Sequence, residues 1–175
     1  NALAAIASVH RYDKNVSDYF PALSSFQGAA RRFEYHGNVN GARCYDDFAH
    51  HPREIRALLE SIKELFPDNR LIIGFQPHTY SRTKLLFDDH LHAFDDADEI
   101  WMMDIYAARE PFDPSIHTSM LIEAMPHKRI TYTPDFPDLR DKMHRDLQEG
   151  DIFFSVGCGD VNRIHDFVTF DKEEQ

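Results

Sequence analysis

Two carboxylates and two imidazoles stand together in one short segment, Asp46-Asp47-Phe48-Ala49-His50-His51-Pro52. A β-rich run precedes the segment and a helical pattern follows it, so these groups lie at the amino end of a helix. Unpaired backbone N–H groups favour anions at such an end, and an aspartate there can accept hydrogen bonds from ribose hydroxyls. Any one of the four side chains could simply cap the helix, but together they favour a ligand site.

A second polar segment, Phe75-Gln76-Pro77-His78-Thr79-Tyr80-Ser81-Arg82-Thr83, follows another β-rich run. The planar guanidinium of Arg82 suits a carboxylate or a phosphate. An arginine that enters a helix is more often a surface residue. Its place beside His78, after a strand, favours a ligand contact.

Two further segments follow strands, Asp104 to Glu110 and Ser155 to Asp160, and Gly157 would let the backbone approach a ligand closely. Arg31-Arg32 precedes the first strand and is equally well explained as a solvated basic pair. The sequence contains no GxxxxGK[ST] loop, no GxGxxG after a first strand and no GxSxG elbow. We therefore expect that this chain does not bind a triphosphate unaided.

A metal-dependent hydrolase is the alternative that the acidic and histidine residues suggest. Their ligand types suit zinc or manganese. Pro52 is expected to turn the neighbouring histidines in different directions, and adjacent histidines rarely share one ion, so we predict no metal site in this chain. The residues considered are Asp46, Asp47, His50, His51 and His78.

The elements that must position these segments alternate between β-rich and amphipathic stretches. The Asn40-Gly41 pair is typical of a two-residue hairpin turn, and apolar residues recur at helical spacing from Pro52 to Phe66. This pattern predicts a Rossmann-like α/β fold: a mostly parallel six-stranded sheet with an N-terminal antiparallel hairpin and helices on both faces. Ligands bind such sheets at the carboxyl ends of the strands. Expected strands span 32–39, 42–47, 70–75, 99–106, 129–133 and 151–156, and further helices 83–94, 119–125, 139–147 and 161–168.

Composition narrows the function classes. The 175 residues carry a formal charge of −11, with 30 acidic against 19 basic side chains, which argues against a nucleic-acid partner. No apolar run approaches the ~20 residues that span a bilayer, and the amino end lacks the pattern of a signal peptide, so we expect a cytoplasmic protein without a membrane partner. Cys44 and Cys158 are expected to be reduced thiols.

Taken in order, six blocks resemble the Mur ligases, most of all those that join L-alanine to UDP-N-acetylmuramate. The DDFAHHP and FQPHTYSRT blocks are the specific ones, and the resemblance covers nearly the whole chain. A related ligase that recycles a murein tripeptide shares the first block but resembles the second less. The blocks are residues 1–7, 26–28 with 31–33, 46–52, 75–83, 104–110 and 157–160.

The resemblance implies an ATP-dependent, Mg2+-assisted ligase of peptidoglycan precursor synthesis, with UDP-N-acetylmuramate and L-alanine as substrates. In that family one domain binds the UDP-sugar, a central domain holds the ATP phosphates, and a last domain closes the site. The chain resembles the last, so its partners would be the other two domains, and alone it is expected to be inactive. Residues 1–24 would end the central domain, 25–170 would form the carboxy-terminal domain and 171–175 a frayed tail. A non-catalytic nucleotide- or amino-acid-binding module is the remaining alternative.

The resemblance also implies roles for individual residues. Asn1 would lie near the adenine, Arg32 would contact phosphate oxygens and stabilise the transferring phosphoryl group, and Asp47 would contact the ribose. Phe48, where the family often has Tyr, lacks a hydroxyl, and Cys158 replaces a common Ala. The residues expected to bind the substrate, with Arg82 on the carboxylate of alanine, are Phe48, His50, His78, Arg82, Gly157 and Asp160.

Overall fold

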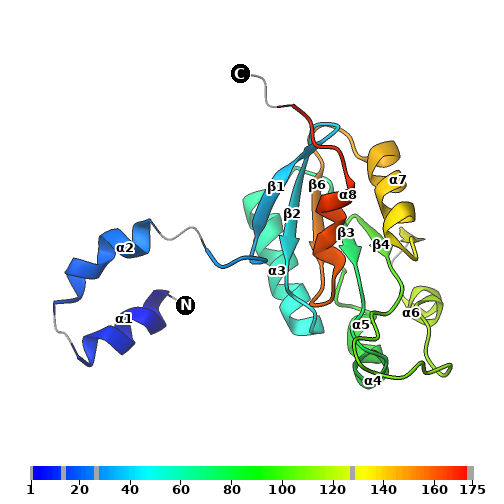
Figure 1. The fold of residues 1–175 in the computed structure, drawn as a ribbon, viewed down its shortest axis with the longest axis horizontal. Coiled ribbons are helices and arrows are strands. Elements are labelled where there is room, and N and C mark those ends of the chain that lie inside the picture. Colours follow the sequence, from blue (N-terminus) through cyan, green and yellow to red (C-terminus); the bar gives the residue numbers. More distant parts are fainter. Residues whose placement is uncertain (1, 13–14, 26–27, 127–128, 173–175) are drawn as a thin grey trace. The chain divides into compact units, whose positions relative to one another are not determined.

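The computed structural model describes residues 2–12, 15–25, 28–126 and 129–172, which form two compact units, Asn1–Ala30 and Arg31–Gln175. The first unit is helical and contains α1 (Ala2–His10), the 3-10 helix η1 (Val16–Tyr19) and α2 (Phe20–Ser24) (Figure 1). An apolar cavity lies between these helices. It is lined by Ala5, Ile6, Val9, Val16, Tyr19, Ala22 and Leu23.

The second unit is built on a six-stranded mixed sheet, as the sequence predicted. Its strands are β1 (Glu34–Val39), β2 (Ala42–Asp47), β3 (Leu71–Phe75), β4 (Glu99–Met102), β5 (Ile130–Tyr132) and β6 (Ile152–Val156). They are ordered β1-β2-β6-β3-β4-β5, with β1 antiparallel to β2 and every other neighbouring pair parallel. The predicted fold class, including the antiparallel hairpin at the start, is confirmed.

The hairpin turn is held by the end of the chain. Asn40 and Gly41 have φ of 52° and 78°, the left-handed values that a two-residue hairpin turn requires. Their N–H groups donate to the carboxylate of Asp171 at 3.1 and 2.7 Å, and the Asp171 N–H donates to the Asn38 carbonyl. The expected fraying of the tail is therefore wrong for Asp171, while residues 173–175 lie outside the described residues.

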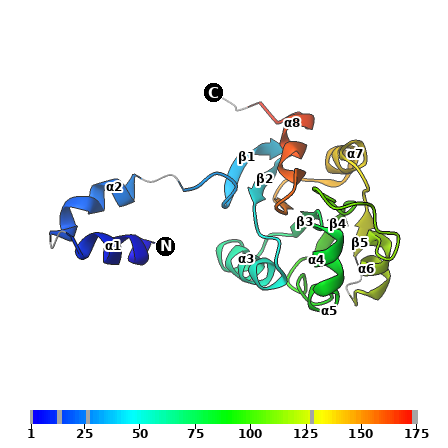
Figure 2. The ribbon, with the colours of Figure 1, turned by 60° about the horizontal axis from the view of Figure 1, so that its bottom comes forward.

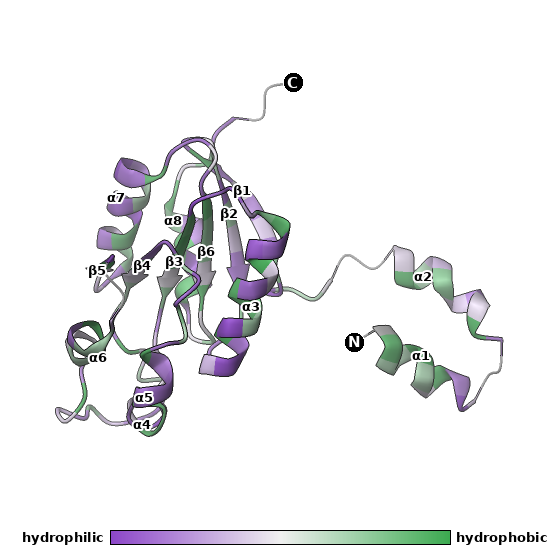
Figure 3. Ribbon diagram, turned by 180° about the vertical axis from the view of Figure 1, so that it is seen from behind, coloured by the Kyte–Doolittle hydropathy of each residue, from purple (hydrophilic) through white to green (hydrophobic). Residues whose placement is uncertain are grey.

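Helices cover both faces of the sheet (Figure 2). Apolar residues of α3 (Pro52–Leu65) and α6 (Thr118–Ala124) pack on one face, near α4 (Tyr80–Leu85) and α5 (Phe87–His90). On the other face lie α7 (Phe136–Asp146), the 3-10 helix η2 (Val161–Arg163) and α8 (Ile164–Phe167). Strands β3 and β6 are buried along their whole length and hydrophobic (Figure 3), which explains their continuous apolar runs.

Several predicted boundaries need correction. Residues 83–94 do not form one helix: α4 begins earlier, at Tyr80, and Leu86, with φ −106° and ψ 18°, separates it from α5. Helix α7 begins at Phe136 because the side chain of Asp135 caps it. The fourth strand ends at Met102, not at residue 106.

Two further expectations concern the cysteines and the membrane. Both Cys44 and Cys158 are free thiols, as expected. Burial raises the pKa of Cys44 to about 12, so this thiol is inert. Within the described ranges, no helix has the length and hydrophobicity needed to cross a bilayer.

Candidate ligand-binding rim at the carboxyl ends of the strands

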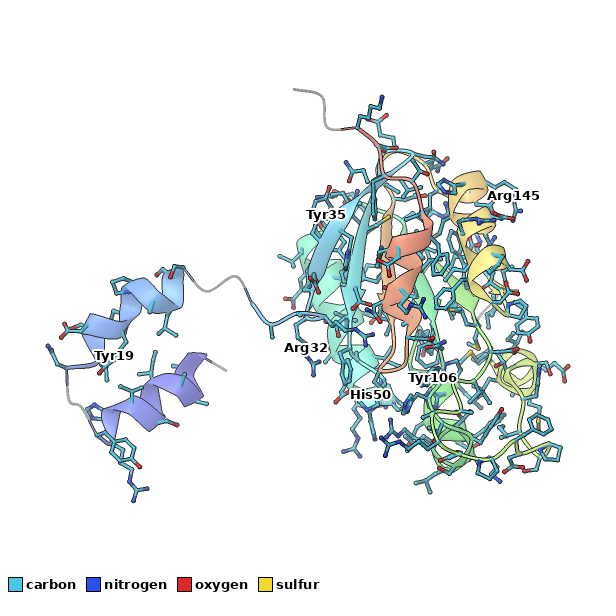
Figure 4. The ribbon with its side chains drawn as sticks, viewed as in Figure 1. Tyr19, Arg32, Tyr35, His50, Tyr106 and Arg145 are labelled. Atoms are coloured by element: carbon cyan, nitrogen blue, oxygen red, sulfur yellow. The ribbon has the colours of Figure 1, made fainter. Side chains whose placement is uncertain are left out.

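Four parallel strands end at the same edge of the sheet. Val156 at the end of β6 is in register with both Asp47 of β2 and Phe75 of β3, and Phe75 is in register with Met102 of β4. The loops that follow these strands therefore start side by side. We call this edge the rim and define it as residues 31–32, 46–51, 76–82, 104–110 and 157–160. Figure 4 shows Arg32, His50 and Tyr106 at this end of the sheet and Arg145 at the other.

Arg31 ties two loops of the rim together. Its Nε donates to Asp46 Oδ2 at 2.9 Å, and its Nη1 and Nη2 donate to the carbonyls of Gly159 and Gly157 at 3.0 and 2.6 Å. The Asp46 carboxylate is fully buried, and burial raises its pKa, although hydrogen bonds from Ser155 and Arg31 oppose the rise. The sequence suggested only a basic pair here, since nothing in it showed that Arg31 points inward.

Arg32, the next residue, points outward. Its side chain is 54% exposed, and its guanidinium lies 5.6 Å from the centre of the Phe48 ring, while that of Arg31 lies 4.9 Å from the same ring. The ring of Phe48 thus supports the guanidinium by a cation–π contact. Arg32 is positioned near the rim yet keeps donors available to a ligand.

Asp47 is mostly turned into the protein. Its Oδ2 accepts from the Phe33 N–H at 3.0 Å and its Oδ1 from the Ala49 N–H at 2.8 Å, and the side chain is 9% exposed. Each carboxylate oxygen has a second lone pair. Asp47 therefore holds the loop in place, and its remaining lone pairs can accept a hydrogen bond from a ligand hydroxyl group.

His50 and His51 have different partners. His50 Nδ1 lies 3.0 Å from the Phe48 carbonyl oxygen, whereas His51 Nδ1 accepts from the Arg53 N–H and forms a capping box with Glu54 at the start of α3. Among the described residues, no three His, Cys, Asp or Glu side chains are grouped to hold a metal ion.

Arg82 lies among loops that follow β3, β4 and β6. Its Nη1 is 3.4 Å from His78 Nδ1 and donates to Cys158 Sγ at 3.6 Å. The His78 ring stacks on Tyr106, with centroids 5.5 Å apart. Burial lowers the pKa of His78, and the positive charge of Arg82 lowers it further. His78 is therefore neutral at neutral pH, and Arg82 is the cation of this group.

Gln76 holds the loop after β6. Its Nε2 donates to Asp160 Oδ1 at 2.9 Å, and its Oε1 accepts from the Asp160 N–H at 3.1 Å. A Cβ on Gly157 would lie 2.9 Å from the Gln76 carbonyl oxygen, which requires glycine there, as does its φ of 149°. Gly157 and Asp160 thus lie on the rim as expected, but the structure gives both a packing role. The sequence places Gln76 in the FQPHTYSRT block but gives no sign of this role.

The rim brings together candidate ligand-binding residues that the sequence predicted on separate segments. Arg82 and His78 meet beside the Gly157 loop. Arg32 and Phe48 form a second group near Asp47. Asn1 lies outside the described residues.

Comparison with known proteins identifies the family. A model of the Mur ligase, glutamate ligase domain matches residues 31–159. The chain belongs to the Mur ligase family. The match begins at Arg31 and ends at Gly159, whose carbonyl accepts a hydrogen bond from the Arg31 side chain.

Relatives and solved structures of Mur ligases agree with this. The chain is 40% identical over 166 residues to the UDP-N-acetylmuramate–L-alanine ligase of Clostridium perfringens, covering 94% of the chain and 36% of the relative. The crystal structure of the UDP-N-acetylmuramate-alanine ligase from Thermotoga maritima matches with a TM-score of 0.76 and 26% identity, over 95% of this chain and 35% of that one.

A murein peptide ligase from Psychrobacter arcticus has the same fold, with a TM-score of 0.70 and 24% identity over 95% of this chain and 35% of that one. The chain thus spans about a third of the length of the Mur ligases it matches.

The buried Arg31–Asp46 pair generates a prediction about stability. Arg31→Ala should lower the free energy of unfolding by about 3 kcal/mol, because it leaves the buried carboxylate of Asp46 without its counter-charge. Without Arg31 the folded-state pKa of Asp46 rises further above its unfolded value. The loss should therefore be smallest below the ordinary pKa of a carboxyl group. It should grow as the pH rises from the folded-state pKa of Asp46 in the parent to its higher folded-state pKa in the variant.

Denaturant unfolding from about pH 3.5 to pH 8 measures this dependence. Arg32→Ala is the matched control, since that exposed side chain should change stability by less than about 0.5 kcal/mol. Equal losses for the two variants, or a loss for Arg31→Ala that does not vary with pH, would contradict the assignment.

Proposed function

We propose that this chain forms the carboxy-terminal domain of an ATP-dependent ligase that adds L-alanine to UDP-N-acetylmuramate in peptidoglycan precursor synthesis, in the cytoplasm. The observation that supports this most is the rim itself. It places two guanidinium groups, Arg32 and Arg82, on one edge of the sheet in a family of amide-forming ligases. Residues 1–24 would belong to the end of the central domain, and the domain proper would begin at about residue 25.

ATP with Mg2+ supplies the phosphoryl group that activates the carboxylate of UDP-N-acetylmuramate, and the amine of L-alanine then displaces phosphate to form the amide. Arg32 would bind phosphate oxygens and stabilise the charge that develops during transfer. Its exposed guanidinium, supported by Phe48, fits that role. We place the magnesium ligands mainly in another domain.

On the other part of the rim, Arg82 would hold the carboxylate of L-alanine through a charge-assisted hydrogen bond. His78 would stay neutral beside it, so that it neither repels Arg82 nor competes for the carboxylate. Phe48, His50, Gly157 and Asp160 would complete the substrate-binding surface.

For the nucleotide, the remaining lone pairs of Asp47 would accept a hydrogen bond from a ribose hydroxyl, and Asn1 would contact the adenine. Asp47 has one exposed cation nearby, Arg32, at 3.9 Å. The two residues could therefore bind adjacent groups of one nucleotide.

Two alternatives remain from the sequence. A tripeptide-recycling ligase shares the fold, but the likeness at 24% identity supports the fold alone, whereas the alanine ligases reach 40% identity. A binding module without catalysis would use the same rim and differ only in lacking a reaction. Turnover of the full-length protein with L-alanine, with the tripeptide or with neither would distinguish these possibilities.

The 175-residue chain by itself should release no phosphate from Mg-ATP in the presence of UDP-N-acetylmuramate and L-alanine. Phosphoryl transfer depends on positioning that the other domains would supply. A phosphate-release assay measures this, with full-length ligase as the positive control. Turnover by the chain alone would show that this domain is sufficient and would overturn the proposed division of labour.

In the full-length ligase, Arg82→Ala should raise the KM for L-alanine by roughly 10- to 100-fold, because a charged hydrogen bond to the carboxylate is lost. The KM for ATP should change little. Steady-state kinetics with each substrate varied in turn measures both. Arg145→Ala, an exposed arginine at the opposite end of the sheet, removes the same charge as a control. An unchanged alanine dependence in Arg82→Ala would remove Arg82 from the amino-acid site.

A further inference from the structure

Helix α4, which carries Arg82, has no means of its own to fix its amino end. It is six residues long, and helices shorter than about 12 residues are marginal without outside contacts. Thr79 occupies the N-cap position but makes no side-chain capping bond, and the first turn contains no acidic residue. The free N–H groups of this turn therefore need an acceptor from another part of the chain.

Glu110, from the loop after β4, supplies that acceptor. Its carboxylate accepts from the Thr79 hydroxyl at 2.5 Å, from the Ser81 N–H at 2.9 Å and from the Ser81 hydroxyl. The bonds from Ser81 and Thr79 lower the pKa of Glu110 to about 2. The carboxylate is thus ionised throughout the physiological pH range and favoured at the positive end of a helix.

The same loop contacts the segment before α4. The Tyr106 N–H donates to the Pro77 carbonyl at 2.8 Å, and the Tyr106 ring stacks on His78. Glu110 binds the residue just before Arg82, while Tyr106 supports the histidine that lies against the Arg82 guanidinium. The loop from Tyr106 to Glu110 therefore fixes both the backbone and the surroundings of Arg82.

We propose that Glu110 is a positioning residue for the amino-acid site: it contacts α4 rather than substrate, and it determines where Arg82 points. This inference rests on the proposed role of Arg82. It adds a second carboxylate-dependent anchor on the rim, independent of the Arg31–Asp46 pair. The effect of losing it should appear in the use of L-alanine and not in the use of ATP.

Asp113 offers a matched control in the same loop. Its carboxylate binds Lys84 Nζ at 2.5 Å and the Ser115 hydroxyl at 2.6 Å. It too is a charged contact between this loop and α4, but it binds Lys84 at the far end of the helix, whereas Glu110 binds Thr79 and Ser81. A general loosening of the loop would affect Glu110→Ala and Asp113→Ala equally.

The experiment is steady-state kinetics of the full-length ligase for Glu110→Ala, Glu110→Gln, Asp113→Ala, Arg82→Ala and the double variant Glu110→Ala/Arg82→Ala. Glu110→Ala should raise the KM for L-alanine by roughly 10-fold, since charged hydrogen bonds to the helix end are lost, and leave the KM for ATP within about 2-fold. Glu110→Gln keeps one carbonyl acceptor and should give a smaller rise. Asp113→Ala should stay within about 2-fold of the parent.

The double variant tests the route of the effect. If Glu110 acts through Arg82, the double variant should match Arg82→Ala, because the two losses are not additive. Additive losses, an unchanged KM for L-alanine in Glu110→Ala, or an equal rise in Asp113→Ala would each overturn the inference.

Hydrogen exchange separates this inference from the proposed function. In the full-length protein, Glu110→Ala should speed amide exchange in residues 79–85, and Asp113→Ala should not do so at Ser81. If exchange changes as expected but Arg82→Ala leaves the alanine dependence unchanged, the proposed role of Arg82 fails and the positioning role fails with it, while Glu110 remains an anchor of α4. If Arg82→Ala behaves as proposed and Glu110→Ala does not, only the inference about Glu110 fails.

Discussion

The ion pair between Arg31 and Asp46 is the interaction on which the rim depends. Asp46 is fully buried at the end of β2, and Arg31 both neutralises it and binds two carbonyls of the loop after β6. Asp46 also accepts from Ser155, whose hydroxyl lies 2.9 Å from His165 of α8. A chain of hydrogen bonds from this guanidinium through Asp46 and Ser155 thus links β2, β6 and α8. Removing one member of such a pair costs more than the pair contributes, so the arrangement favours one geometry of the rim.

Three arginines lie on the rim of a protein that is acidic as a whole. The chain has a net charge of −11, yet Arg31, Arg32 and Arg82 lie at the carboxyl ends of its parallel strands. The guanidinium of Arg31 is bound within the protein, whereas Arg32 is exposed and Arg82 contacts a neutral histidine and a thiol. Anionic ligands would therefore find their partners in Arg32 and Arg82, in a protein that otherwise repels anions.

The fold and the place of the site could be predicted from the sequence because the signals are local. The apolar runs of β3 and β6 and the Asn40-Gly41 turn each determine their own conformation. The contacts that shape the rim are not local. Arg31 binds residues 126 and 128 positions away, and Glu110 caps a helix 29 positions before it. For the same reason the start of α4 at Tyr80 was missed, since its cap comes from another loop.

The central claim is that the rim is the ligand-binding face of this domain. A crystal structure of the full-length protein with an ATP analogue and the alanyl product tests this claim most directly. We expect the carboxylate of the alanyl group within hydrogen-bonding distance of Arg82 and phosphate oxygens within reach of Arg32. Ligands bound without any contact from residues 46–51, 76–82 or 157–160, with Arg32 and Arg82 facing solvent, would contradict it.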